Sequence, residues 1–178
     1  MKTITKIIAT SAAVVALLFT TNANAQAPQR LGIGLNVGIP TSDQYKLSLG
    51  ADIRYQFDVD KQLSIPVTAG YTNFSGKDIE GTNFKWDNYG FIPVKVGAKY
   101  FFDPSGSGFY GLAEVGAAFG VTPSGAGTGF LYSPAIGYSW SNGIDLGVKY
   151  EGNTANPTNL IPKPQGQVAL RLAYGFSL

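Results

Sequence analysis

The stretch GQVALRLAYGFSL, residues 166–178, places a large apolar side chain at every second position. Successive side chains of an extended chain point to opposite faces, so this segment has one apolar face and one face of small or polar residues. Such alternation is typical of a β-strand that separates an apolar from a polar environment. The segment alone does not say which of its faces points outward.

The same alternation recurs in seven earlier segments and predicts eight strands in all. Three connections, at residues 58–61, 103–107 and 141–143, are short and rich in turn formers, whereas those at 75–88, 122–128 and 152–164 are longer. Tight turns at one end and longer loops at the other predict an all-β fold, an eight-stranded antiparallel up-and-down transmembrane β-barrel. The predicted strands are 31–39, 46–57, 63–72, 94–102, 113–121, 130–140, 144–151 and 166–178.

The N-terminus has the layout of a secretory signal peptide. Lys2 and Lys6 precede an apolar run at residues 7–19, which is followed by small residues ending at Ala25. We therefore expect a signal peptide at residues 1–25 and a barrel domain at 26–178. Without Lys2 and Lys6, the 13 Lys and Arg residues fall to 11, which equals the 11 Asp and Glu residues. This balance gives no indication of nucleic-acid binding.

Charged residues on the small-residue faces of the strands favour a polar interior. Only 13% of the chain is charged, against about a quarter in a typical soluble domain. Glycine-rich faces carrying both signs of charge suit a narrow lumen filled by ion pairs better than a solvated surface. The predicted lumen network consists of Lys46, Asp52, Arg54, Lys95, Lys99, Glu114, Asp145, Lys149, Glu151 and Arg171.

Aromatic residues on the apolar faces gather at two heights, as in the girdles of membrane barrels. The tight-turn end has Tyr55, Phe57, Tyr100, Phe102, Phe109, Tyr138, Trp140, Tyr174 and Phe176, and the long-loop end has Tyr71, Phe119, Phe130, Tyr132 and Tyr150. Both belts favour lipid outside the barrel.

Three prolines, Pro66, Pro93 and Pro134, fall inside predicted strands. Proline cannot donate to a strand ladder, so we expect β-bulges at these positions. The strongest candidate is Ile92-Pro93, before which Tyr89 and Phe91 fall on the side of the lumen.

The chain resembles the small outer-membrane β-barrel family of Gram-negative bacteria, which includes the transmembrane domain of outer-membrane protein A and stand-alone relatives. The resemblance rests on the signal peptide, the eight alternating strands, and the stretches FIPVKVGAKYFF, GFYGLAEVGAAFG and GQVALRLAYGFSL. It implies residence in the cell outer membrane, contact with outer-membrane lipid and lipopolysaccharide, and recognition by the outer-membrane assembly machinery. Relatives usually end on an aromatic residue read by that machinery; here the corresponding signal is Tyr174, Phe176 and the final Leu178.

Histidine and cysteine are both absent from the chain. A Ser-His-Asp triad cannot be built, nor can zinc or copper sites of the usual ligands. Small barrels of this kind that are enzymes resemble one another in using a histidine base. We therefore expect no catalytic residues, cofactor or metal, and a non-enzymatic structural or surface-interaction role. Two alternatives remain: a narrow channel for ions or small hydrophobic molecules, and a secreted soluble barrel that binds an apolar ligand.

The connection from Ser75 to Asn88 is the best candidate for a functional surface. It carries Phe84, Lys85 and Trp86 among charged residues. Exposed aromatics there are suited to contact with a surface partner, which the sequence does not identify, or with lipopolysaccharide. They suit equally well a role as anchors at the membrane edge.

Overall fold

A computed structural model describes residues 29–81, 83–155 and 165–178 of the chain, so the predicted signal peptide and the start of the mature domain lie outside the described residues. Eight strands make up the described structure. They are β1 (Gln29–Pro40), β2 (Tyr45–Asp58), β3 (Leu63–Gly76), β4 (Tyr89–Phe101), β5 (Gly108–Thr122), β6 (Thr128–Ser139), β7 (Ile144–Asn153) and β8 (Gln165–Ser177). No described segment forms a helix with the length and hydropathy of a membrane span.

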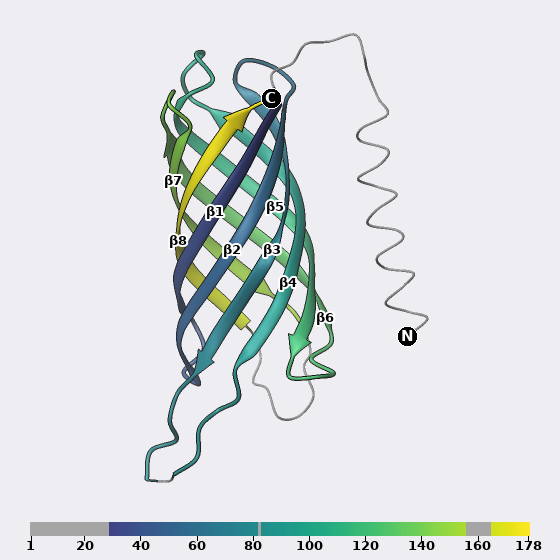
Figure 1. Ribbon diagram of the computed structural model, residues 1–178, viewed down its shortest axis with the longest axis vertical. Helices are drawn as coiled ribbons and strands as arrows, with labels where there is room; N and C mark the ends of the chain where they lie inside the picture. The colour runs from purple at the N-terminus through teal and green to yellow at the C-terminus, as the bar shows by residue number, and fades with distance from the viewer. Residues whose placement is uncertain (1–28, 82, 156–164) are drawn as a thin grey trace, which may run out of the picture.

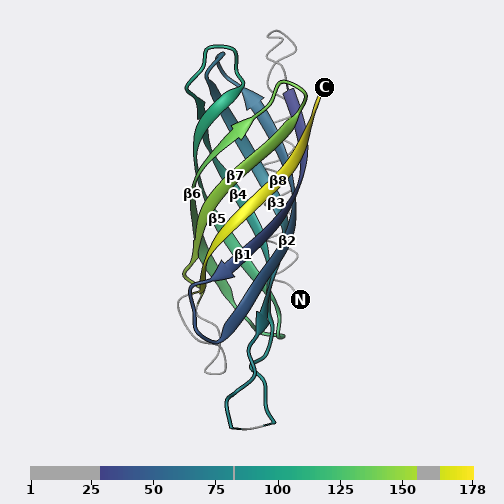
Figure 2. The same cartoon turned by 90° about the vertical axis from the view of Figure 1, so that its left-hand side faces the viewer.

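The strands form a closed antiparallel barrel in sequence order, which confirms the predicted fold class. Closure is made by β1 and β8, which pair from Arg30 opposite Ser177 to Pro40 opposite Gln167. The strands tilt around an elongated cylinder, with the C-terminus at the same end as the start of β1 (Figures 1 and 2). Because every strand has two neighbours, the sheet has no open edge, and its backbone polar groups are paired within the barrel.

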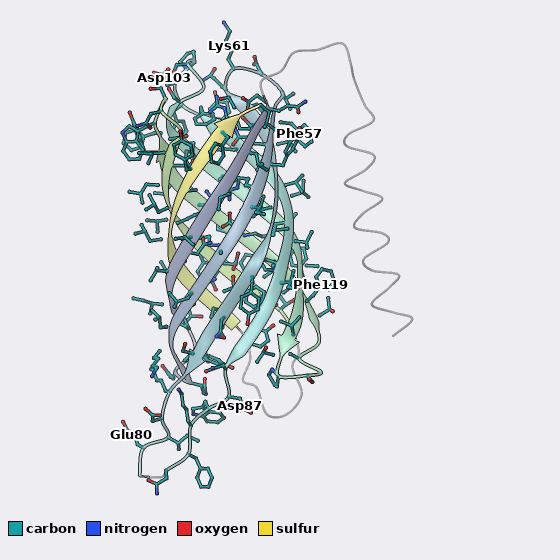
Figure 3. All side chains as sticks on the ribbon, in the orientation of Figure 1. Phe57, Lys61, Glu80, Asp87, Asp103 and Phe119 are labelled. Atoms are coloured by element: carbon teal, nitrogen blue, oxygen red, sulfur yellow. The ribbon has the colours of Figure 1, made fainter. Side chains whose placement is uncertain are left out.

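The two ends of the barrel differ. One end holds the connections between β2 and β3, β4 and β5, and β6 and β7, where Lys61 and Asp103 lie (Figure 3). At the opposite end, the connection between β3 and β4 projects well beyond the cylinder and carries Glu80 and Asp87 (Figure 3). These are called the turn end and the loop end.

Strand faces follow the alternation of the sequence, with apolar side chains outside and polar side chains inside. Leu35 is 63% exposed and Ile136 is 70% exposed, whereas Glu114 is 2% exposed and Arg171 is 4% exposed. A barrel that encloses an apolar ligand has the opposite arrangement, so the alternative of a soluble ligand-binding barrel is wrong for this chain. Its outer face instead matches the lipid-facing surface of a membrane barrel.

Aromatic pairs mark the turn end of the outer face, as predicted. Ring centroids lie 4.6 Å apart for Tyr55 and Phe57, 5.9 Å apart for Tyr100 and Phe102, and 4.9 Å apart for Tyr174 and Phe176. These pairs lie at or just beyond the ends of β2, β4 and β8, which all finish at the turn end. They form one of the two girdles expected at a membrane interface.

The predicted β-bulges are absent at Pro66 and Pro134, whereas a register shift does lie directly before Ile92-Pro93, the position where a bulge was expected most. The registers of β3 with β2 and β4 run unshifted past Pro66, and the registers of β6 run unshifted past Pro134. Pro93 also stays in register with Ala118; the shift in that pair of strands lies between Gly90 and Phe91. Each proline interrupts the ladder locally, and the pairs on both sides hold the register.

Candidate functional site

The lumen contains nine of the ten charged residues that the alternation predicts there, each buried: Asp52, Arg54, Lys95, Lys99, Glu114, Asp145, Lys149, Glu151 and Arg171. Lys46 is the exception, because it is exposed. A register shift between Tyr45 and Leu47 places the Tyr45 ring among the buried lumen side chains and takes Lys46 out of the regular alternation. Its assignment to the lumen network is therefore wrong.

One group of lumen charges is centred on two aspartates nearer the turn end. The Arg171 guanidinium contacts Asp52 through Nη2 at 2.6 Å and through Nε at 3.1 and 3.2 Å. Its Nη1 atom lies 3.5 Å from Asp145 Oδ1, and Lys99 Nζ lies 2.7 Å from Asp145 Oδ2. The Tyr110 hydroxyl donates to Asp145 at 2.8 Å. Two acids and two bases thus form a continuous chain of contacts.

In the second group of lumen charges, three basic residues form ion pairs with two glutamates. Arg54 Nη2 lies 3.2 Å from Glu114 Oε2, and Lys95 Nζ lies 3.4 Å from the same oxygen. Lys95 also lies 2.6 Å from Glu151 Oε2, which Lys149 approaches to 3.3 Å. Both glutamates accept further hydrogen bonds, from Thr68 at 2.6 Å and Gln167 at 2.9 Å respectively.

Three of these ion pairs cross the lumen. Lys99–Asp145 and Lys95–Glu151 join β4 to β7, and Arg54–Glu114 joins β2 to β5. In the closed order of strands, each of these pairs has two strands between its members on one side and four on the other. The side chains therefore lie across the interior rather than along its wall. This suits an eight-stranded barrel, in which side chains fill the interior.

Two glycines make room for long side chains. Gly34 on β1 lies under the guanidinium of Arg171, and a Cβ there would come within 2.7 Å of Nη2. This space lets Arg171 pass from β8 over β1 to reach Asp52 on β2. In the same way, Gly137 on β6 lies under Tyr110, whose hydroxyl reaches from β5 to Asp145 on β7.

An aromatic cluster fills the lumen toward the loop end. It consists of the buried residues Tyr45, Phe74, Tyr89, Phe91, Ala118, Ala126 and Leu131. Tyr89 and Phe91 stack with ring centroids 5.5 Å apart, and Phe74 lies 5.8 Å from Phe91. The prediction that Tyr89 and Phe91 face the lumen is confirmed. Tyr45 could not be predicted in this cluster, because its inward direction depends on the register shift that follows it.

A cavity of about 530 Å³ occupies the turn end of the lumen. Its wall includes Gly32, Arg54, Lys99, Asp145 and Arg171 from the strands, and its mouth is bordered by the turns at residues 105–107 and 140–143. We call this cavity the vestibule. Its lining includes Lys99, Asp145 and Arg54, which belong to two of the cross-lumen ion pairs.

The connection between β3 and β4 forms a hairpin beyond the barrel. Ile79 N donates to Phe84 O at 2.9 Å, and Trp86 N donates to Lys77 O at 3.0 Å. The Lys77 N–H also donates to Gln44 O at 2.7 Å, which ties the hairpin to the connection between β1 and β2. Phe84 is 74% exposed, Lys85 is exposed and Trp86 is half-buried.

The C-terminal residues lie on the outer face of β8. Tyr174 and Phe176 are partly exposed in the aromatic girdle at the turn end, and Leu178 is exposed beyond it. The backbone N–H of Leu178 donates to Gln29 O at 2.9 Å. The end of the chain is thus fixed against the first strand, at the seam where the barrel closes.

Comparison with known proteins gives a family match and several structural neighbours. The family described as "Outer membrane protein beta-barrel domain" matches residues 10–176, whereas no curated protein matches the chain. Ail of Yersinia pestis, solved in a phospholipid bilayer nanodisc, is similar with a TM-score of 0.58 at 14% identity, covering 85% of this chain and 100% of that chain.

Two further structures have the same architecture. A de novo designed transmembrane β-barrel has a TM-score of 0.52 at 19% identity, covering 85% of this chain and 98% of its own. Neisserial surface protein A has a TM-score of 0.51 at 13% identity, with the same two coverages. At these identities the likeness concerns the fold.

Proposed function

Because this chain belongs to the outer membrane protein beta-barrel domain family and lies in the cell outer membrane, we propose that it is a non-enzymatic barrel with a closed lumen and a structural or surface-interaction role. By the usual arrangement of such barrels, the turn end faces the periplasm and the loop end faces the outside. The absence of histidine and cysteine supports the non-enzymatic part of the proposal, because histidine is the most frequent general base and the two residues are the usual ligands of zinc and copper.

The observation that carries the proposal is the set of three ion pairs across the lumen. A buried charge is costly unless it is paired and hydrogen bonded, and here each glutamate and aspartate in the lumen contacts two basic residues or one basic residue through several atoms. An ion that crosses the barrel has to separate at least one of these pairs. The aromatic cluster beyond them adds an apolar barrier toward the loop end.

The surface-interaction part of the proposal rests on the projecting hairpin. The connection between β3 and β4 projects beyond the barrel (Figure 1). Backbone hydrogen bonds link its two arms, and Phe84 within it is exposed. An exposed aromatic beside Lys85 offers both an apolar contact and a positive charge to a partner or to lipopolysaccharide. Both residues are exposed, whereas the charged residues of the lumen are buried.

For assembly, we propose that the outer-membrane machinery reads Tyr174 and Phe176 on the outer face of β8. Both rings lie on the outer face of β8 and are exposed in the closed barrel. They therefore stay accessible in the state before β8 has paired with β1. Replacing Phe176 by serine is expected to slow insertion in cells while leaving refolding into lipid unchanged. Equal loss in both assays would assign Phe176 to barrel stability instead.

Conductance in planar bilayers tests the closed lumen. The wild-type protein is expected to give no reproducible current steps under conditions in which a large porin does. The narrow-channel alternative predicts steady steps whose size changes in Lys99→Met and Glu114→Gln, because both residues lie on the cross-lumen contacts. Such steps would overturn the proposal.

A further inference from the structure

We propose that the vestibule binds a free, phosphate-sized oxyanion from the periplasmic side. Among the described residues, its lining includes four basic residues, Arg30, Arg54, Lys99 and Arg171, and one acidic residue, Asp145. A concave site that is lined mainly by one sign of charge and has walls of low dielectric constant concentrates ions of the opposite sign. This inference goes beyond the proposed structural role and does not depend on it.

The charges around the vestibule do not balance. Among the described residues, five buried basic residues and four buried acidic residues face the lumen. The group near the turn end pairs Lys99 and Arg171 with Asp52 and Asp145, which leaves it neutral. The other group has Arg54, Lys95 and Lys149 on Glu114 and Glu151. One positive charge therefore remains uncompensated inside the barrel.

Arg54 brings that excess charge to the vestibule. Its Nε donates to Thr68 at 3.0 Å and its Nη2 to Glu114 at 3.2 Å, while its Nη1 donates no hydrogen bond within the part of the chain that the structure describes. Because Arg54 also lines the vestibule, an oxyanion there can accept from this remaining donor. Guanidinium groups match the geometry of phosphate and carboxylate oxygens better than that of a spherical ion.

Arg30 provides a second guanidinium at the mouth. Its Nε lies 3.5 Å from Asp58, and its two Nη atoms lie 3.4 Å from Gly106 O, so all three contacts are long. Such contacts are weak and exchange readily for a shorter charged hydrogen bond. The volume of about 530 Å³ holds an oxyanion together with several waters, since a water occupies about 30 Å³.

Gly32 offers a matched pair of variants. It lines the vestibule on β1, and a Cβ added there would have Tyr174 O at 3.6 Å and Arg54 O at 3.7 Å, which is ordinary contact. Gly32→Glu places a carboxylate beside the uncompensated charge and competes with a bound anion. Gly32→Gln has almost the same shape without the charge.

The test is equilibrium dialysis of the folded protein in detergent against labelled inorganic phosphate, at constant ionic strength set with chloride. We expect one phosphate per barrel for the wild type and for Gly32→Gln, with affinities within about twofold. For Gly32→Glu we expect binding at least tenfold weaker, which corresponds to about 1.4 kcal/mol. Direct binding is measured because phosphate also stabilises proteins in general by exclusion from their surfaces.

Two results would overturn the proposal. The first is the absence of stoichiometric binding to the wild type, and the second is equal binding to Gly32→Glu and Gly32→Gln, which would place the anion elsewhere. Folding of each variant is checked by the gel mobility shift on boiling. If both Gly32 variants misfold, Ala173→Glu and Ala173→Gln repeat the comparison from β8, since Ala173 lines the same vestibule.

Discussion

Removing the Asp145 carboxylate is expected to be among the most destabilising single changes in the lumen. Asp145 accepts from Lys99 at 2.7 Å and from Tyr110 at 2.8 Å, and it lies 3.5 Å from Arg171. Asp145→Asn keeps the shape of the side chain but leaves Lys99 buried without the one acidic contact it has among the described residues. Breaking a buried ion pair in this way costs about 3–5 kcal/mol.

Lys99→Met is expected to cost less, about 1–3 kcal/mol, because Arg171 and Tyr110 still contact Asp145. The double variant Asp145→Asn/Lys99→Met lacks both charges, so neither charge is left buried without its partner. Its destabilisation is therefore expected to fall short of the sum of the single effects by at least about 1 kcal/mol. The free energy of unfolding is measured by reversible urea titration in lipid vesicles, with tryptophan fluorescence as the signal.

Lys61→Met serves as the control, because Lys61 is exposed in the turn between β2 and β3. A change of less than about 0.5 kcal/mol is expected there. The reasoning is refuted if Asp145→Asn costs no more than this control. It is refuted equally if the effects of Asp145→Asn and Lys99→Met are simply additive, because the two residues would then not be coupled.

Three further changes test other parts of the structure. Leu170→Arg, on the outer face of β8, is expected to lower the free energy of unfolding in lipid by about 2–4 kcal/mol, and a neutral result would contradict the assignment of faces. Gly137→Val fills the space that the Tyr110 side chain occupies above Gly137, so the free energy of unfolding is expected to fall by about 1–3 kcal/mol in the same titration. An unchanged midpoint would show that Tyr110 repacks freely. Replacing Phe84 and Trp86 together by serine is expected to spare folding and the gel shift on boiling, and failure to assemble would make the hairpin structural.

The strands could be predicted from the sequence because the boundary between lipid and lumen imposes a period of two on every strand. The segments around Leu35, Leu170 and Ile136 therefore identify both the strand and its outer face. Strand ends were predicted less well, since β4 begins at Tyr89 rather than at residue 94. There the inward residues are aromatic, so the contrast between the two faces disappears.

Lys46 and the prolines show where local pattern is insufficient. Whether Lys46 points inward depends on one register shift between Tyr45 and Leu47, for which the alternation gives no signal. Pro66 and Pro134 are accommodated without a shift, because the neighbouring pairs hold the register on both sides. Both outcomes are decided by pairing with the adjacent strands.

Which lumen residues would be charged could be predicted, but their partners could not. Lys99 contacts Asp145 and Lys95 contacts Glu151 across the barrel. Each pair meets because its two residues lie at the same height along the barrel axis, and that height depends on the tilt and stagger of all eight strands. The role of Gly34 under Arg171 depends on the same geometry. A sequence pattern records the face of each residue and leaves its height in the closed barrel undetermined.

The closed lumen is tested most directly by chemical labelling of two positions on the inner face of β6. The chain has no cysteine, so Ser139→Cys and Ser133→Cys each introduce a single reactive thiol. Ser139 lines the vestibule, whereas Ser133 is buried deeper in the lumen. With a hydrophilic, membrane-impermeant maleimide, the structure predicts fast labelling of Ser139→Cys and none of Ser133→Cys in the folded protein. Similar labelling rates at both positions would show an open, water-filled lumen and contradict the account.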